Sequence, residues 1–138
     1  MFLITRKAEF SASHRLARPD WSEAKNQEVF GLESQTHGHN YILEVTVAGQ
    51  VDPNHGMIMD LKELKDIIND EVVDKWDHRH LNHEAAPFDR VIPTTENVAA
   101  EVWKRLSPKI SSDTARLHSI RLYETPDLYV DYSGPEAA

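Results

Sequence analysis

The stretch that decides the fold is His37-Gly38-His39-Asn40-Tyr41, which begins a run of alternating side chains from residue 38 to residue 50. Successive side chains of a β-strand point to opposite faces, so the two histidines at i and i+2 share one face. Apolar residues continue this alternation, and Asp52-Pro53-Asn54 ends it with turn chemistry. The sequence therefore predicts a strand over 38–50 that presents two imidazoles near its start.

A third histidine, His14, lies in the earlier stretch Phe10-Ser11-Ala12-Ser13-His14-Arg15-Leu16. It follows a predicted strand over 2–12, which can pair with 38–50 as a hairpin. Three imidazoles with one open position are how a catalytic zinc is held. The chain has no cysteine, so disulfides and thiolate ligands are excluded, and any metal must use His, Asp or Glu. The alternative is a polar strand end that binds no metal.

The remaining chain predicts two helices and two further strands. Residues 17–36 are polar and irregular and are expected to form a long loop, which in a compact domain is usually functional. Asp60 is placed to cap an amphipathic helix over 61–75, and Thr94 or Thr95 caps a second helix that ends at Pro108. Strands are expected over 115–124 and 128–133. The order ββααββ predicts an α+β fold: a four-stranded antiparallel sheet with two helices on one face.

The bulk composition limits the possible functions. A chain of 138 residues is expected to form one domain over 1–138, and its net charge of -8 argues against nucleic-acid binding. No apolar stretch is long enough to span a membrane, so no membrane association is expected. The N-terminus lacks the pattern of a signal peptide, which makes the cytoplasm the expected location. A sheet with open edges favours homo-oligomers through edge pairing.

The two histidine motifs closely resemble those of the 6-pyruvoyltetrahydropterin synthase and 6-carboxytetrahydropterin synthase family. The resemblance continues through 52–61 (DPNHGMIMDL), 76–82 (WDHRHLN), 93–97 (PTTEN) and 122–125 (LYET). Because these segments occur in order over nearly the whole chain, chance is a poor explanation.

The resemblance implies a tunnel fold, in which subunits join their sheets edge to edge into a barrel. It implies a hexamer, two trimers face to face, with active sites between subunits. It also implies Zn²⁺ bound by His14, His37 and His39, which would hold the hydroxyls of a pterin substrate's side chain and acidify them.

The resemblance further implies a pterin-binding site around Glu124. This glutamate would accept hydrogen bonds from a ring N–H and from the amino group of the pterin. Thr95 and Glu96 would line the same pocket.

The sequence departs from the family at its catalytic base. The pyruvoyl and carboxy enzymes carry a cysteine in the loop before His-Gly-His, assisted by the histidine and aspartate that match His78 and Asp77. Here Glu33 stands four residues before His37, which matches the position of the cysteine in the carboxy enzymes, whose loop is shorter. This resembles a third class of homologues, in which glutamate replaces cysteine and 7,8-dihydroneopterin compounds become 6-hydroxymethyl-7,8-dihydropterin for folate synthesis.

The chemistry of the base favours this third class. A free carboxylate has a pKa of about 4.3 against about 8.5 for a thiol, so it is the weaker base. It can take the proton of a zinc-bound hydroxyl more easily than a proton on carbon. The sequence therefore predicts a zinc-dependent lyase with Glu33 as base and Asp77-His78 as acid–base partners.

Alternatives remain open for the whole protein and for these residues. The protein could be a 6-carboxytetrahydropterin synthase of the queuosine pathway, a 6-pyruvoyltetrahydropterin synthase, or a pterin-binding homologue without activity. Glu33 could be a solvated loop carboxylate, and Asp77-His78 could be an ion pair that only holds a turn.

Overall fold

The two longest strands, β1 (Phe2–His14) and β2 (His37–Gly49), pair antiparallel along their whole length in the computed structural model, which describes residues 1–136. The predicted strand over 38–50 is confirmed to within one residue. The first strand runs two residues beyond the predicted end and includes His14. Their register places His14 opposite His37 and Ala12 opposite His39.

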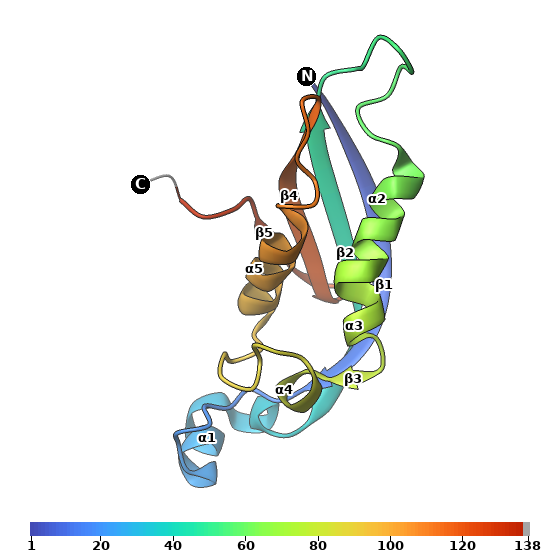
Figure 1. Ribbon diagram of the computed structural model, residues 1–138. Coiled ribbons are helices and arrows are strands. Elements are labelled where there is room, and N and C mark those ends of the chain that lie inside the picture. The colour runs from blue at the N-terminus through green and yellow to red at the C-terminus, as the bar shows by residue number, and fades with distance from the viewer. Residues whose placement is uncertain (137–138) are drawn as a thin grey trace.

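Three further strands complete a five-stranded sheet in the order β3-β1-β2-β4-β5 (Figure 1). The predicted C-terminal strands are confirmed as β4 (Ala115–Thr125) and β5 (Leu128–Tyr132), both antiparallel to their neighbours. The fifth strand, β3 (Arg79–His80), runs parallel to β1 beside Ala12 and Ser13. The prediction of four antiparallel strands is wrong here, because a strand of two residues has no alternation that a sequence could display.

The helices α2, α3 and α5 pack on one face of the sheet (Figure 1). A nearly continuous helical segment confirms the helix predicted over 61–75, and the Asp60 side chain caps it. The second predicted helix is also confirmed, and its N-cap is Thr94. The bounds are α2 (Leu61–Ile68), a π-helical turn (Asn69–Val73), α3 (Asp74–Trp76), α4 (Leu81–Glu84) and α5 (Thr95–Leu106).

The segment 17–36 is not the irregular loop that the sequence predicted. It contains helix α1 (Glu23–Phe30) and a 3-10 turn, η1 (Gly31–Ser34). The Ser22 side chain caps α1 by accepting a hydrogen bond from the backbone N–H of Lys25. Asn26 is the buried residue of α1, so the helix lacks an apolar stripe, which explains why periodicity missed it. In Figure 1 this segment lies beyond the end of β1 and the start of β2.

One hydrophobic core fills the space between the sheet and the helices. At its centre the Trp76 ring packs edge-on against Phe10 and Phe88, with ring centroids 5.8 and 5.5 Å away. Phe10 in turn stacks on Tyr41 across the β1–β2 pair. The core thus reaches the end of the sheet that carries the histidines. Within the described part of the chain, no helix has the length and apolar character needed to cross a membrane.

Gly49, at the end of β2, provides a test of the packing. A Cβ at this position would overlap the carbonyl oxygen of Thr114 and lie 2.6 Å from Ile58 Cγ2. We expect Gly49→Ala to lower the free energy of unfolding by about 1–3 kcal/mol, because backbone or core must shift. The measurement is urea denaturation at a fixed protein concentration.

Gly38→Ala is the matched control in the same strand. An added Cβ there would have Ala12 O as its nearest atom, at an ordinary 3.5 Å, so this glycine is not needed for a close backbone approach. We expect a change within about 0.5 kcal/mol. Equal losses in the two variants would contradict this account.

Candidate metal centre and substrate site

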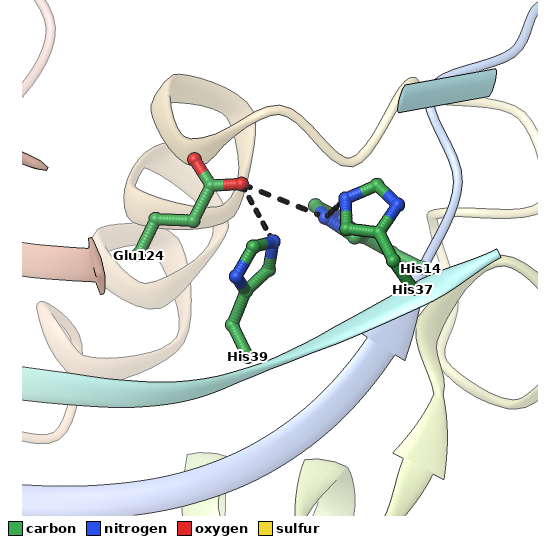
Figure 2. A group of neighbouring side chains, drawn as sticks. All are labelled: His14, His37, His39 and Glu124. Carbon is green, nitrogen blue, oxygen red and sulfur yellow. Dashed lines mark hydrogen bonds and ion pairs between the residues drawn. The ribbon is translucent and has the colours of Figure 1, made fainter. Parts of the chain in front are cut away.

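Three histidines and a glutamate meet at one end of the sheet (Figure 2). His14 comes from β1, His37 and His39 come from β2, and Glu124 comes from the end of β4. One ligand atom from each of these side chains lies within 4.8 Å of all the others. The three imidazoles therefore converge as their spacing predicted. We call these four residues the ligand group.

Backbone carbonyls fix the protonation of two imidazoles in the ligand group. His14 Nδ1 lies 2.8 Å from the Pro93 oxygen, and His37 Nδ1 lies 2.7 Å from the Gln35 oxygen. Because a carbonyl oxygen only accepts, each Nδ1 carries the proton and donates it. Each Nε2 then presents a lone pair, yet the two Nε2 atoms are only 3.0 Å apart. Two facing lone pairs repel each other unless a cation lies between them.

His39 and Glu124 complete the same arrangement. His39 Nε2 is buried and makes no hydrogen bond, although Glu124 Oε1 lies 2.9 Å away. The same oxygen is 3.7 Å from His14 Nε2. The donor atoms of a tetrahedral zinc with bonds of about 2.0–2.1 Å lie about 3.3–3.4 Å apart, which is within this range. The ligand group therefore fits a divalent metal ion.

Burial keeps two imidazoles of the ligand group, those of His14 and His39, in the form that binds metal. It lowers the pKa of His14 to about 4, and it also lowers the pKa of His39 below its ordinary value. Both rings are therefore neutral at pH 7. Metal ions bind neutral imidazole, so no proton has to leave these two histidines first.

Tyr41 is a site residue to which sequence reasoning gave no role. Its ring packs edge-on against His14 and His39, and its hydroxyl lies 3.4 Å from His14 Nδ1. Burial raises the pKa of this hydroxyl, which stays protonated. Tyr41 could have been found from the alternation alone, because residues 37, 39 and 41 of a strand share one face.

The predicted Asp77-His78 pair is hydrogen-bonded to Ser11 of strand β1. Asp77 Oδ1 accepts a hydrogen bond from Ser11 N at 2.8 Å, and the His78 N–H donates to Ser11 O at 2.6 Å. Asp77 Oδ2 lies 2.9 Å from His78 Nδ1. These contacts, led by the Ser11 N–H, lower the pKa of Asp77. His78 has a φ of 62°, which is uncommon outside glycine, and its side chain is 84% exposed.

The other predicted site residues differ in how they lie relative to the ligand group. Thr95 Oγ1 donates to Glu124 Oε2 at 2.6 Å, so these two meet as expected. Glu33 is exposed in η1, and its negative charge slightly opposes the lowering of the His39 pKa that burial causes. Glu96 is exposed on the first turn of α5, and in the part of the chain described it makes no hydrogen bond or ion pair with the ligand group.

Two cavities reach the ligand group at His39. One, of about 640 Å³, is lined by Glu124 and by residues of β1, β2 and the β4–β5 turn. The other, of about 450 Å³, is lined by His78 and the residues that follow it. Both share Gly38, His39 and Asn40. Each has the size of a small-molecule site, and a substrate in either lies beside a ligand-group histidine.

Comparison with known proteins identifies the family. The sequence profile of 6-pyruvoyl tetrahydropterin synthase matches residues 3–135. The chain is 36% identical over 132 residues to the 6-pyruvoyl tetrahydrobiopterin synthase of Dictyostelium discoideum, covering 96% of each chain. The chain belongs to the 6-pyruvoyl tetrahydropterin synthase family. The structure of the Caenorhabditis elegans 6-pyruvoyl tetrahydropterin synthase matches with a TM-score of 0.89 at 36% identity, covering 97% of this chain and 96% of that one.

More distant relatives carry related names. The 6-carboxy-5,6,7,8-tetrahydropterin synthase of Rickettsia conorii is 29% identical over 147 residues, covering 95% of this chain and 99% of its own. A Plasmodium vivax 6-pyruvoyltetrahydropterin synthase has the same fold at 15% identity, with a TM-score of 0.62 over 96% of this chain and 98% of its own; it is a variant in which a catalytic glutamate is changed to alanine. The protein is thus a pterin-processing enzyme of a family of lyases.

The ligand group predicts a metal-binding test. We expect the chelator-treated protein to take up about one Zn²⁺ per chain, measured by plasma mass spectrometry after dialysis. His37→Gln should raise the dissociation constant for Zn²⁺ more than about 100-fold. Substituting a residue that only hydrogen-bonds a metal ligand already weakens metal binding about 10- to 100-fold, and His37 would itself be a ligand.

His55→Gln is the control, since His55 is exposed in a turn near Asp52, outside the ligand group. It should leave zinc uptake unchanged. Wild-type affinity in His37→Gln would mean that the facing imidazoles do not hold the metal.

Proposed function

We propose that the enzyme is a zinc-dependent lyase that cleaves the side chain of 7,8-dihydroneopterin, or of its mono- or triphosphate, to give 6-hydroxymethyl-7,8-dihydropterin for folate synthesis. The observation that carries the proposal is the identity of the base. The chain has no thiol, and Glu33 stands four residues before His37, with its charge acting on the ligand group. A glutamate is also the catalytic residue named for the Plasmodium vivax relative.

In this reaction Glu33 takes the proton from the hydroxyl on C2′ of the side chain. The C2′ oxygen becomes a carbonyl, the C1′–C2′ bond breaks, and its electron pair passes through C1′ into the pterin ring. C1′ then takes up a proton, which leaves the hydroxymethyl group and a two-carbon aldehyde that carries any phosphate. Bound Zn²⁺ supplies Lewis acidity that lowers the pKa of the substrate's hydroxyls.

Glu124 anchors the pterin ring in the larger cavity. A carboxylate has two acceptor oxygens, which match a ring N–H and the neighbouring amino group. Thr95 Oγ1 donates to one of these oxygens and keeps the side chain directed at the cavity. Glu96, which is exposed nearby, is proposed to contact the substrate at the rim.

His78 is proposed as the acid–base partner of Glu33. Its imidazole is 84% exposed and can both donate and accept a proton. Asp77 accepts from the Ser11 N–H through one oxygen and faces His78 through the other, so it orients the ring. His78 lines the smaller cavity together with His39, which supports a position beside the substrate's side chain.

A second candidate is 6-pyruvoyltetrahydropterin synthase activity, because the relatives at 36% identity carry that name. That reaction removes carbon-bound protons and eliminates triphosphate, for which a carboxylate is a weaker base than a thiolate. The 6-carboxytetrahydropterin synthase reaction is a third candidate on the same ground. The product formed distinguishes the three.

We also propose that the chain assembles into a homo-oligomer, as a hexamer of two trimers. Most of β1 and the whole of β5 are edge strands in the described sheet. Both edges carry exposed apolar residues, with Phe2 and Leu3 59% and 52% exposed on β1, and Leu128 50% exposed on β5. Open edges of this kind pair with other chains.

The proposed reaction is tested by product analysis. Zinc-loaded protein is incubated with 7,8-dihydroneopterin and its mono- and triphosphate, and products are identified by chromatography and mass spectrometry. We expect 6-hydroxymethyl-7,8-dihydropterin. A pyruvoyl or carboxy pterin would overturn the proposed side-chain cleavage and favour the corresponding synthase.

The assignment of Glu33 is tested separately. Glu33→Gln should lower turnover by about 10²- to 10⁴-fold, the usual contribution of a positioned base, while zinc and pterin binding persist. Glu28→Gln removes another exposed carboxylate of the same segment and should retain activity. If Glu33→Gln turns over at the wild-type rate, this residue is not the base.

A further inference from the structure

Glu124 occupies a position that suits two different partners. We propose that, without substrate, Glu124 Oε1 is the fourth ligand of the metal, and that a bound pterin draws the carboxylate away and opens this position. This inference rests on the proposed metal and pterin site, and it adds a state in which that site is closed. It predicts that substrate binding itself activates the centre.

The side chain geometry supports a ligand role. Oε1 lies 2.9 Å from His39 Nε2 and 3.7 Å from His14 Nε2, which is the spacing of atoms that share one ion (Figure 2). His39 Nε2 makes no hydrogen bond in spite of its distance to Oε1. With His39 neutral, an imidazole nitrogen and a carboxylate oxygen at this distance, in a geometry that does not suit a hydrogen bond, can bind one cation between them.

The other oxygen of Glu124 is held separately. Oε2 accepts the hydrogen bond of Thr95 Oγ1 at 2.6 Å, and Thr95 is buried at the start of α5. Thr95 therefore directs Oε1, and not Oε2, at the imidazoles. The N-terminal end of the helix also favours a negatively charged carboxylate beside it.

The two partners of Glu124 exclude each other. The edge of a pterin that donates the ring N–H and the amino N–H lies at the opposite end of the ring from the side chain. A pterin whose side chain is at the metal therefore needs the Glu124 carboxylate away from the metal, so Oε1 cannot remain among the imidazoles. Four protein ligands close a zinc site, whereas three leave a position for a substrate. The closed state also neutralises part of the metal charge. The centre would thus reach full Lewis acidity only with pterin in place.

No other carboxylate shares this arrangement in residues 1–136, where Glu124 is the acidic member of the ligand group. Glu44 lines the same cavity but lies outside the group and pairs with Lys7 at 3.6 Å. Glu44→Gln is therefore a matched control, because it removes one carboxylate from the same cavity and no ligand.

The test uses the full-length protein loaded with Co²⁺, whose visible absorption reports the number of its ligands. Glu124→Gln should weaken Co²⁺ binding at least about tenfold and change the spectrum, because one charged donor is lost. Glu44→Gln should bind Co²⁺ as the wild type does. Thr95→Val, which keeps the carboxylate but removes its support, should change affinity and spectrum in the same direction as Glu124→Gln.

Unsubstituted pterin is the probe for the opening step, because it has no side-chain hydroxyls to bind the metal. Adding it should shift the wild-type cobalt spectrum towards that of Glu124→Gln and weaken Co²⁺ binding. By thermodynamic reciprocity, Co²⁺ should weaken pterin binding by the same factor. Glu124→Gln should show neither effect.

The outcomes separate this inference from the proposed function. If neither Glu124→Gln nor Thr95→Val alters Co²⁺ affinity or spectrum, Glu124 is not a ligand, even if the wild type makes 6-hydroxymethyl-7,8-dihydropterin. If pterin binds without changing the wild-type spectrum, the opening step is wrong. If both effects appear but no hydroxymethyl product forms, Glu124 is a metal ligand that pterin displaces, and the proposed side-chain cleavage is wrong.

Discussion

The register between β1 and β2 is the constraint on which the site depends. Side chains of a strand alternate with period two, so a slip of one residue would move His14 to the opposite face from His37 and His39. The register is held by the core, because Phe10 and Tyr41 lie opposite each other, are buried, and stack with ring centroids 5.0 Å apart. The buried Phe10–Tyr41 pair therefore fixes the positions of the ligand-group histidines that lie further along β1 and β2.

The segment from Pro93 to Thr95, the first residue of α5, is the second support of the site. Its Pro93 carbonyl fixes the His14 tautomer, and its Thr95 hydroxyl holds the Glu124 carboxylate. The helix that follows is anchored in the core by Val98 and Val102, which are fully buried. The start of α5 therefore orients both His14 from β1 and Glu124 from β4. The packing of α5 in the core is in this way coupled to the geometry of the ligand group.

Much of this architecture could be predicted from local patterns, and the misses have physical causes. The main strands, the helix over 61–75 and the convergence of His14, His37 and His39 follow from period-two and helical spacing. Helix α1 was missed because it buries almost no apolar surface, and β3 because a two-residue strand has no periodicity. The proximity of Glu124 to the imidazoles depends on tertiary packing, which no local pattern records.

A chain without thiols must divide its acid–base chemistry among carboxylates and histidines, and here two glutamates stand near the same imidazoles in opposite surroundings. Glu124 is only 14% exposed, held by Thr95 and turned towards the ligand group, so it is suited to bind and orient. Glu33 is exposed on a short turn and held through its backbone, whose carbonyl accepts from the Leu16 N–H, so its side chain is free to move towards a substrate. Environment, and not residue type, separates an anchoring carboxylate from one that can act as a base.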